Sequence, residues 1–260
     1  MAKFVPSVAF SQKAYTALAP GESVNMEHDL SKAYDFTKAG EGTYSFEAYN
    51  LFYVVDDSAK ITTLQADVKA HTARISGKLH VARRAFLGRF GRRANSGCSG
   101  SQQTAISNAI TAVLSYAAES FSYISSHTSA TTRFETWFGT YATPRHDTVQ
   151  AVLSHISGNS FSSFTYDCSC DDPGVFAYVY PAEFGSIYFC SAFWEAPTTG
   201  TDSQGGTLIH EASHFIANGG TSDHVYGQSG CETLATNDPD LAVDNADSFQ
   251  YFAENNPTLS

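Results

Sequence analysis

The stretch His210-Glu211-Ala212-Ser213-His214 decides how this sequence of 260 residues is interpreted. Residues four apart share one face of a helix, so His210 and His214 can present two imidazoles to one metal ion. Glu211 lies about 100° around the same turn, where its carboxylate can reach a metal-bound water without binding the metal itself. Apolar residues precede the motif and Gly219-Gly220 follows it, which predicts a helix that ends at the glycine pair. The pattern predicts a zinc site equipped for hydrolysis.

A zinc ion that keeps one catalytic position free needs a third protein ligand. Asp223 lies nine residues after His214, beyond the glycine pair, where a turn could bring a short carboxylate back to the metal. Glu232 lies eighteen residues after His214 and is the competing candidate, which would suit a ligand carried by a second helix. Spacing alone leaves both residues open.

The sequence around this motif resembles a known family. The motif is followed by Gly220-Thr221-Ser222-Asp223-His224-Val225-Tyr226-Gly227, and together they resemble the aspzincin metallopeptidases, whose pattern is H-E-x-x-H and then G-T-x-D-x-x-Y-G. Residues 94–260 resemble one branch of that family, the fungal peptidyl-lysine metalloendopeptidases. The matching stretches are residues 168–170, 176–181, 192–204 and 251–257.

The resemblance assigns roles to the residues of the motif. It implies that His210, His214 and Asp223 bind one zinc ion per chain, which favours Asp223 over Glu232. Glu211 is then the catalytic acid/base, which takes a proton from the zinc-activated water and gives it to the leaving amine. Tyr226 is expected to steady the oxyanion of the tetrahedral intermediate.

Charge is divided unevenly along the chain. Residues 1–93 contain 13 of the 15 Lys and Arg residues but only 9 of the 26 acidic ones. Residues 94–260 contain two arginines against 17 acidic residues, and the chain has no lysine after Lys78. A protease that cuts at lysine benefits from a body without lysine, and its acidic surface attracts cationic substrates. A low lysine content is also common in secreted acidic proteins.

Selectivity for lysine needs an anionic pocket beside the zinc. In the branch that this sequence resembles, the pocket acids lie near the C-terminus, and Asp247 falls on one of those positions. Gln250 stands three residues later, where a glutamate is expected. One carboxylate attracts an ammonium group less strongly than two, so Gln250 leaves strict lysine selectivity open. A peptidase of broader specificity is the alternative.

The five cysteines indicate an oxidising compartment and a secreted protein. The resemblance implies the pairs Cys98 with Cys168 and Cys170 with Cys190, although the sequence alone allows other pairings. Cys231 is left over. We expect it to be a buried small residue on a helix after Tyr226, and a reactive thiol near the metal is the alternative.

The first third of the chain resembles part of the family's pro-region. Short alternating runs over residues 1–57, such as Ser7–Phe10 and Gly42–Phe46, predict a small antiparallel β unit. Residues 58–93 are basic and predict a linker and processing segment, with a maturation cut after Arg93 that leaves Ala94 as the new N-terminus. The pro-region looks short at its start, and Met1-Ala2-Lys3-Phe4 is not a signal peptide. We therefore expect the chain to be N-terminally trimmed, or to come from a gene model that missed an upstream exon.

Residues 94–260 predict an α+β, zincin-like catalytic domain with a zinc-binding active-site helix, preceded by the small antiparallel β pro-domain remnant. Helical spacing of apolar residues predicts a long helix over residues 102–126 and a second over 146–156. Strands are expected at residues 164–166, 176–180 and 186–189.

These observations predict a secreted zinc metalloendopeptidase that cuts on the N-terminal side of lysine. Its partners are protein or peptide substrates, and we expect a monomer with no nucleic-acid partner. No stretch of the sequence is long and apolar enough to span a membrane. Two rival functions remain. One is the same enzyme held latent while residues 1–93 cover its cleft, and the other is a binding protein that has kept the scaffold.

Overall fold

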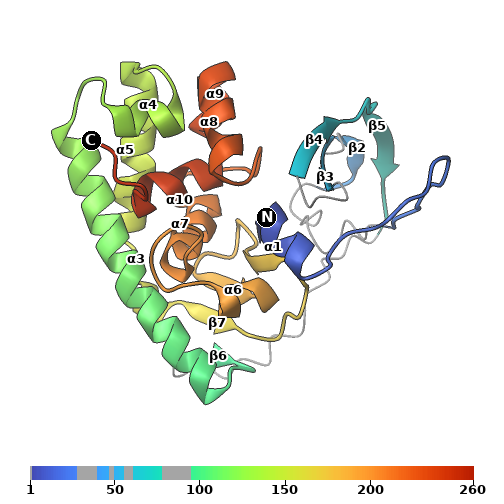
Figure 1. Cartoon of the computed structure of the whole chain (residues 1–260), viewed down its shortest axis with the longest axis horizontal. Coiled ribbons are helices and arrows are strands. Elements are labelled where there is room, and N and C mark those ends of the chain that lie inside the picture. Colours follow the sequence, from blue (N-terminus) through green and yellow to red (C-terminus); the bar gives the residue numbers. More distant parts are fainter. Residues whose placement is uncertain (1, 28–39, 47–49, 56–60, 78–94) are drawn as a thin grey trace. The chain divides into compact units, whose positions relative to one another are not determined.

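The structure is a computed structural model that describes residues 2–27, 40–46, 50–55, 61–77 and 95–260 (Figure 1). The chain divides into two compact units, one of residues 1–14 with 92–260 and the other of residues 15–91. The predicted boundary between residues 57 and 58 does not coincide with this division. The extent of a pro-region therefore stays a prediction.

A five-stranded mixed sheet forms one side of the larger unit. Its strand order is β1-β8-β9-β7-β6. Strands β6, β7 and β9 are parallel to one another, whereas β8 and β1 are each antiparallel to their neighbours. The strands are β1 (Ala2–Phe4), β6 (Asn95–Ser96), β7 (Thr165–Asp167), β8 (Val175–Tyr178) and β9 (Ser186–Phe189). The three strands expected after residue 160 are confirmed to within two residues at each end.

Helices pack beside this sheet around a common core. The longest, α3 (Gly100–Ser126), begins at Ser99 with a capping box to Gln102 and buries an apolar stripe that includes Ile106, Val113 and Ile124. It packs against α5 (Thr143–Ser157) and α7 (Gln204–His214). Helices α3 and α5 confirm the two helices predicted over residues 102–126 and 146–156. The other helices are α4 (Thr132–Phe138), η2 (Phe161–Ser163), α6 (Ser191–Glu195), α8 (Gln228–Asn237), α9 (Pro239–Ala242) and α10 (Ala246–Glu254). Among the described residues, no helix is both long and apolar enough to cross a membrane.

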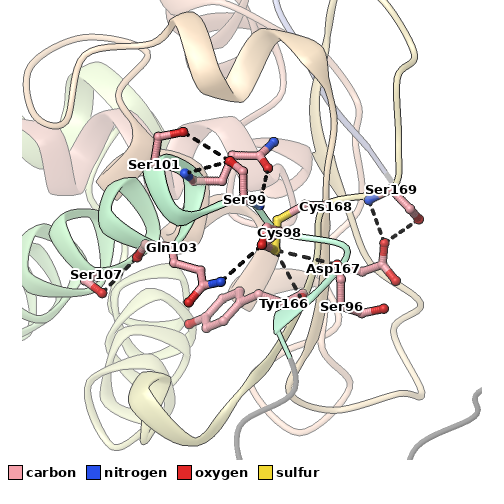
Figure 2. Close-up of a disulfide and its surroundings, with 11 residues drawn as sticks. Ser96, Cys98, Ser99, Ser101, Gln103, Ser107, Tyr166, Asp167, Cys168 and Ser169 are labelled. Atoms are coloured by element: carbon pink, nitrogen blue, oxygen red, sulfur yellow. Dashed lines mark hydrogen bonds between the residues drawn. A yellow bond between two sulfur atoms is a disulfide. The ribbon is translucent and has the colours of Figure 1, made fainter.

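Two disulfides tie together segments that flank the strands of this unit. The pairs are Cys98–Cys168 and Cys170–Cys190, as the resemblance implied. Figure 2 shows the first of them beside the capped start of α3, where the Gln103 side chain donates to the Cys98 carbonyl. The disulfide therefore anchors the long helix to the end of β7.

The segment Ser7–Phe10 was expected to be extended, and this expectation is wrong. It belongs to helix α1 (Pro6–Ser11). Pro6 occupies the first helical position, where its fixed φ favours the helix and its missing N–H costs nothing. Ala9 is buried against Gly174, where a Cβ atom would lie only 2.8 Å from Ala9. This close approach anchors the helix to the loop before β8.

The smaller unit consists of two antiparallel strand pairs. Strand β2 (Gly42–Phe46) pairs with β5 (His71–Ile75), and β3 (Leu51–Val55) pairs with β4 (Ile61–Gln65). The expected β structure at Gly42–Phe46 is confirmed. Within the predicted linker, residues 61–65 and 71–75 form strands β4 and β5, in keeping with the β-branched residues Ile61, Thr62 and Thr63. The predicted cut between Arg93 and Ala94 lies outside the described residues.

Candidate metal centre and active site

Helix α7 carries the two predicted histidine ligands. The Ser203 hydroxyl caps its N-terminus by accepting a hydrogen bond from the backbone N–H of Gly206 at 2.9 Å. The helix ends at His214, so the predicted end at Gly219-Gly220 is wrong by several residues. Phe215 is fully buried and adopts an extended backbone conformation, which terminates the helix earlier.

The glycine pair instead reverses the chain. Gly219 and Gly220 have φ angles of 156° and 69°, which side-chain-bearing residues rarely adopt. After the turn, the backbone N–H of Thr221 donates to the Ser213 carbonyl at 3.1 Å, so the returning segment lies beside the end of α7. The reversal brings Asp223 to the two histidines, where the resemblance, rather than its spacing, implied that it would lie.

The three candidate ligand atoms form a nearly equilateral triangle. His210 Nε2 lies 3.1 Å from His214 Nε2, and Asp223 Oδ1 lies 3.2 Å from each of them. Ligand atoms bound to one tetrahedral zinc ion at about 2.0–2.1 Å lie roughly 3.3–3.4 Å apart. The side chains of both histidines are fully buried, and that of Asp223 is nearly so. The residues therefore fit a zinc ion with only a slight outward movement.

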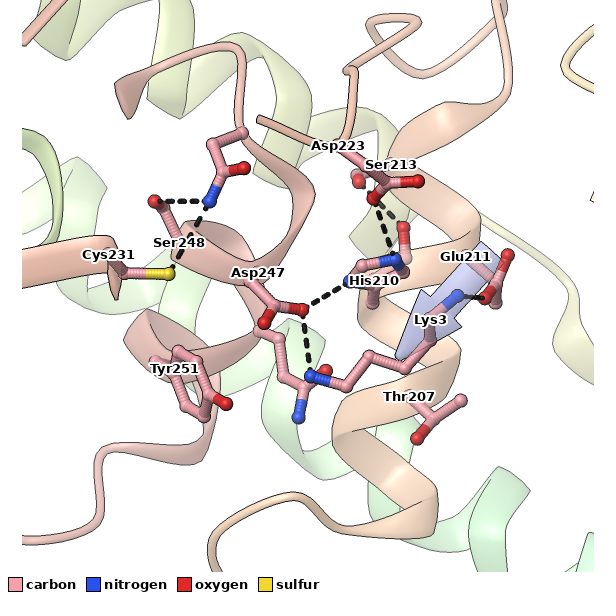
Figure 3. A network of polar contacts seen from close by, with 12 residues as sticks. Lys3, Thr207, His210, Glu211, Ser213, Asp223, Cys231, Asp247, Ser248 and Tyr251 are labelled. Atoms are coloured by element: carbon pink, nitrogen blue, oxygen red, sulfur yellow. Dashed lines mark hydrogen bonds and ion pairs between the residues drawn. The ribbon is translucent and has the colours of Figure 1, made fainter. Parts of the chain in front are cut away.

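The outer nitrogen of each histidine faces an oxygen atom, and Figure 3 shows this contact for His210 and Asp247. His214 Nδ1 lies 2.7 Å from the Thr221 carbonyl, and His210 Nδ1 lies 2.7 Å from Asp247 Oδ1. Each oxygen holds a proton on Nδ1 and leaves the Nε2 lone pair available to a metal. The outer contacts thus select the tautomer that binds zinc.

Charge at this cluster is balanced between imidazoles and carboxylates. Burial opposes protonation of His210, but Asp223 and Asp247 outweigh it and raise its pKa to about 9. Burial likewise opposes ionisation of Asp223, yet the two histidines hold its pKa well below the usual range. Metal binding at His210 Nε2 must therefore release a proton.

Glu232, the competing third ligand, lies elsewhere. It is exposed on α8 and lines a surface pocket with Glu135 and Trp137. A second group with metal-ligand chemistry, Cys170, Asp172 and Cys190, is excluded because its two cysteines form a disulfide. Within the described ranges, the His210–His214–Asp223 cluster is the candidate metal site that remains.

Glu211 lies beside the cluster without joining it. Its side chain is fully buried, and burial raises the pKa of its carboxyl despite the nearby histidines. The carboxylate oxygen in the cluster belongs to Asp223 and not to Glu211. Glu211 Oε2 has no hydrogen-bond partner among the described residues. A buried carboxylate oxygen with no partner is costly unless water or substrate completes the site. This is the placement expected of a general base.

Strand β1 lies along β8 at the edge of the sheet, with Lys3 opposite Ala177. The backbone N–H of Lys3 donates to Glu211 Oε1 at 3.1 Å (Figure 3). An extended segment of the chain therefore forms the edge strand beside Glu211. The amide nitrogen nearest to that glutamate belongs to a lysine.

The Lys3 side chain ends in a buried acidic pocket. Its Nζ lies 2.7 Å from Asp247 Oδ1 and 3.4 Å from Asp202 Oδ1. The Tyr251 ring centroid is 5.1 Å from the same nitrogen, within range of a cation–π interaction. Burial lowers the pKa of Lys3, but Asp247 and Asp202 more than compensate, so the pKa is raised and Lys3 is an ammonium.

Asp247 and Gln250, the two predicted pocket residues, are both buried on α10 and differ in what they contact. Asp247 Oδ1 contacts Lys3 and His210, and its Oδ2 accepts from the backbone N–H of Gly227. Gln250 Nε2 donates to Glu254 Oε1 at 3.0 Å. Asp247 thus contacts the lysine directly, whereas Gln250 hydrogen-bonds to a second acidic residue of the same helix.

The remaining predicted residues lie near the site. Tyr226 follows Asp223 by three residues, and its ring packs edge-to-face on Phe4 at 5.8 Å between centroids. Cys231 is buried on α8, where Asn245 Nδ2 approaches its sulfur at 3.4 Å and burial raises the pKa of the thiol. Its burial on that helix matches the expectation of a small core residue.

Three residues of the site were missed by the sequence analysis, namely Lys3, Asp202 and Glu254. Asp202 and Glu254 lie within the stretches 192–204 and 251–257 that carry the family resemblance, so the signal was present but no chemistry marked it. Lys3 lies in a segment that was assigned to the pro-region. Only the pairing of β1 with β8 reveals its place.

Two histidines and an aspartate around a helix-borne glutamate, beside an edge strand that binds an extended segment, define a zinc metalloendopeptidase. The family model described as lysine-specific metallo-endopeptidase, or aspzincin, matches residues 123–254. The chain belongs to this family.

Similar proteins extend the match beyond those residues. The peptidyl-Lys metalloendopeptidase of Grifola frondosa is 51% identical over 263 residues, which cover 99% of this chain and 75% of that protein. The peptidyl-Lys metalloendopeptidase of Armillaria mellea is 48% identical over 262 residues, covering 99% and 74%. The solved structure of a zinc peptidase from Grifola frondosa is similar with a TM-score of 0.62 and 56% identity. It covers 63% of this chain and 100% of that one.

Proposed function

We propose that this enzyme hydrolyses peptide bonds on the N-terminal side of lysine, with one zinc ion held by His210, His214 and Asp223. The observation that carries the proposal is the position of Lys3. Its ammonium group lies in the acidic pocket at Asp247, and its own amide nitrogen lies 3.1 Å from Glu211 Oε1. The bond between Ala2 and Lys3 therefore has the register of a scissile Xaa-Lys bond.

The chain's own residues divide the catalytic work. When bound, zinc supplies a Lewis acid that polarises the scissile carbonyl and lowers the pKa of a water ligand. Glu211 accepts the proton of the attacking water and delivers it to the lysine nitrogen, from which its Oε1 is 3.1 Å in the Lys3 arrangement. Burial raises the pKa of Glu211, which makes its carboxylate a stronger base. Tyr226 steadies the oxyanion.

The surrounding architecture supports this mechanism. Strand β8 receives an extended peptide in antiparallel pairing, and the ligand helix α7 contacts both β8 and β1. We infer a zincin-like arrangement, in which the edge strand aligns the substrate along the metal site. The two disulfides favour an enzyme that works outside the cell.

The test combines metal analysis with a cleavage profile. The full chain is loaded with zinc, processed to its active form and incubated with a peptide library in which every residue type occurs on both sides of the bond. We expect one zinc per chain and cuts enriched for lysine immediately after the broken bond. Cuts without that enrichment would leave a peptidase of broader specificity, and a chain that binds no zinc would refute the metal assignment.

We propose as a second function that the uncut chain is latent. Strand β1 occupies the edge of β8, and Lys3 fills the pocket that the substrate lysine needs, so a substrate has to displace them. In the uncut chain this strand stays covalently linked to residues 94–260. A cut after Arg93 is expected to lower its local concentration and release it.

Latency is tested by assaying Xaa-Lys peptide cleavage before and after cleavage at Arg93. We expect the uncut chain to be at least about tenfold less active, because an intramolecular segment competes at an effective concentration of order millimolar. Lys3→Ala in the uncut chain is expected to restore part of the activity, whereas Lys69→Ala, which removes the same charge from an exposed position, is not. Equal activities of the cut and uncut chains would exclude latency and leave the catalytic proposal untouched.

A further inference from the structure

The lysine pocket has one carboxylate fewer than expected on α10, because residue 250 is a glutamine. A second carboxylate nevertheless faces the Lys3 ammonium from another part of the chain. Asp202, in the loop before α7, places Oδ1 3.4 Å from Lys3 Nζ, and Asp247 approaches the same nitrogen at 2.7 Å. The ammonium therefore lies between two carboxylates that are 45 positions apart in the sequence.

We propose that Asp202 is a specificity-determining residue that supplies the second negative charge for the substrate lysine. The proposal rests on the proposed function, with Lys3 standing in for a lysine that follows the scissile bond. It also bears on the question raised by Gln250, since a second carboxylate reaches the ammonium group from the loop.

Asp202 is fixed in position from both its backbone and its side chain. Its φ angle of 52° lies in the left-handed region, which aspartate tolerates better than most residues. Its backbone N–H donates to Glu254 Oε2 at 3.1 Å, and its Oδ1 accepts from the Tyr251 hydroxyl at 2.6 Å. The carboxylate is thus held at the pocket before any lysine enters.

Gln250 contributes to this arrangement from behind. Its amide donates to Glu254 Oε1, which also accepts from the backbone N–H and the hydroxyl of Ser203. Glu254 in turn anchors Asp202 through the opposite oxygen. Gln250 and Glu254 are therefore positioning residues, and Asp202 is the group that meets the ammonium.

The two lysine-binding carboxylates differ in their other contacts. Asp247 is fully buried and shares Oδ1 between Lys3 and His210. The Asp202 side chain is 26% exposed, and the side-chain contacts that the described residues give it are to Lys3 and Tyr251. Asp202 can therefore change lysine recognition without disturbing a metal ligand.

A purely structural role for Asp202 is the alternative, in which its carboxylate only anchors the Tyr251 hydroxyl. Asp202→Asn separates the two roles, because the amide oxygen can still accept from Tyr251 while the negative charge is lost. The matched control is Asp240→Asn, which removes one charge from an exposed carboxylate that pairs with Arg145 on the surface.

The first measurement uses the full chain in its active, zinc-loaded form and compares kcat/KM for two peptides that differ only in lysine or norleucine after the scissile bond. We expect Asp202→Asn to lower the lysine-to-norleucine ratio about tenfold or more, because a partly desolvated ion pair is lost. Zinc content is expected to match the parent chain, and Asp240→Asn to keep the parent ratio. An unchanged ratio in Asp202→Asn overturns the proposal if the parent chain prefers lysine. A parent chain without that preference refutes the proposed function instead.

The second measurement does not depend on activity. In the uncut full chain, Lys3 is buried between the two carboxylates and is expected to react slowly with acetic anhydride. Asp202→Asn should increase acetylation of Lys3 several-fold relative to exposed Lys69, as quantified by mass spectrometry. Acetylation at the parent rate in a folded Asp202→Asn chain would overturn the role of Asp202.

Discussion

The proposed metal centre and the lysine pocket meet at Asp247 on α10 but are assembled in different ways. The proposed metal ligands His210, His214 and Asp223 come from fourteen consecutive residues, so their spacing is visible in the sequence. The pocket takes Asp202 from a loop and Asp247 from α10, with Tyr251 as its wall. Chemistry fixed by local geometry can be predicted from a motif, whereas specificity built from distant segments requires the fold.

The largest effect is expected from a substitution at Glu211, which should largely abolish catalysis while leaving zinc binding intact. Glu211→Gln should lower kcat by about 10³-fold, because the general base is lost. Its zinc content should stay that of the parent, since Glu211 is outside the ligand triangle. Kinetics on a lysine peptide and metal analysis measure both. Glu232→Gln is the control and should change neither kcat nor zinc content. A Glu211→Gln chain that keeps the parent kcat would refute Glu211 as the general base.

The second prediction concerns Glu254 at the back of the pocket. Burial raises the pKa of Glu254 to about 7 against its ordinary value of 4.5, although the Ser203 donors and Lys3 oppose the shift and Asp202 adds to it. The folded chain therefore binds an extra proton. Binding this proton stabilises the folded chain relative to the unfolded one. The stabilisation is complete below pH 4.5, and roughly 3 kcal/mol of it is lost as the pH rises through 7.

Denaturant unfolding of the parent chain and of Glu254→Gln, at pH 4.5 and pH 7.5, measures that term. Replacing one acceptor oxygen affects the variant at both pH values, so the difference in unfolding free energy between parent and variant is compared across pH. That difference should shift against the parent chain as the pH rises. A constant difference would show that Glu254 is ionised in the pocket throughout this range.

The third prediction tests where the two regions meet. Asp247→Asn should weaken zinc binding by about 10–100-fold, because the oxygen that orients His210 loses its charge. The same variant should also lose preference for lysine over norleucine. Competition with a chelator and the peptide pair described above provide the two readings. Loss of selectivity with unchanged zinc affinity would show that the regions are independent at Asp247.

The smallest expected effect concerns the free thiol. Cys231 is fully buried behind the pocket, and burial raises the pKa of its thiol well above the ordinary value, so it should not react with iodoacetamide in the folded chain. Cys231→Ala is expected to cost about 1 kcal/mol of stability and to leave zinc content unchanged. Rapid alkylation of the native chain would instead support a reactive thiol.

Much of the catalytic unit could be predicted because its signals are local. Helical spacing of apolar residues located α3 and α5, and the motif located α7. The end of α7 was misplaced because a buried Phe215 terminates the helix before the glycines do. The pairing of β1 with β8 spans more than 170 residues, and no property of Ala2–Phe4 alone indicates its partner. The place of Asp202 in the pocket could not be predicted for the same reason, because its contact with Lys3 also joins distant segments.

Strand β8 becomes the edge of the sheet only when β1 is displaced, and this has a consequence for which lysines can be reached. Where β1 lies, three consecutive residues pair with β8 through their backbones. A substrate that takes this place must be extended over the same span, whatever its side chains. A lysine on the surface of a stable helix, although fully accessible to solvent, cannot adopt that shape without local unfolding. Such an enzyme selects its substrates first by their backbone conformation and then by the charge of the lysine.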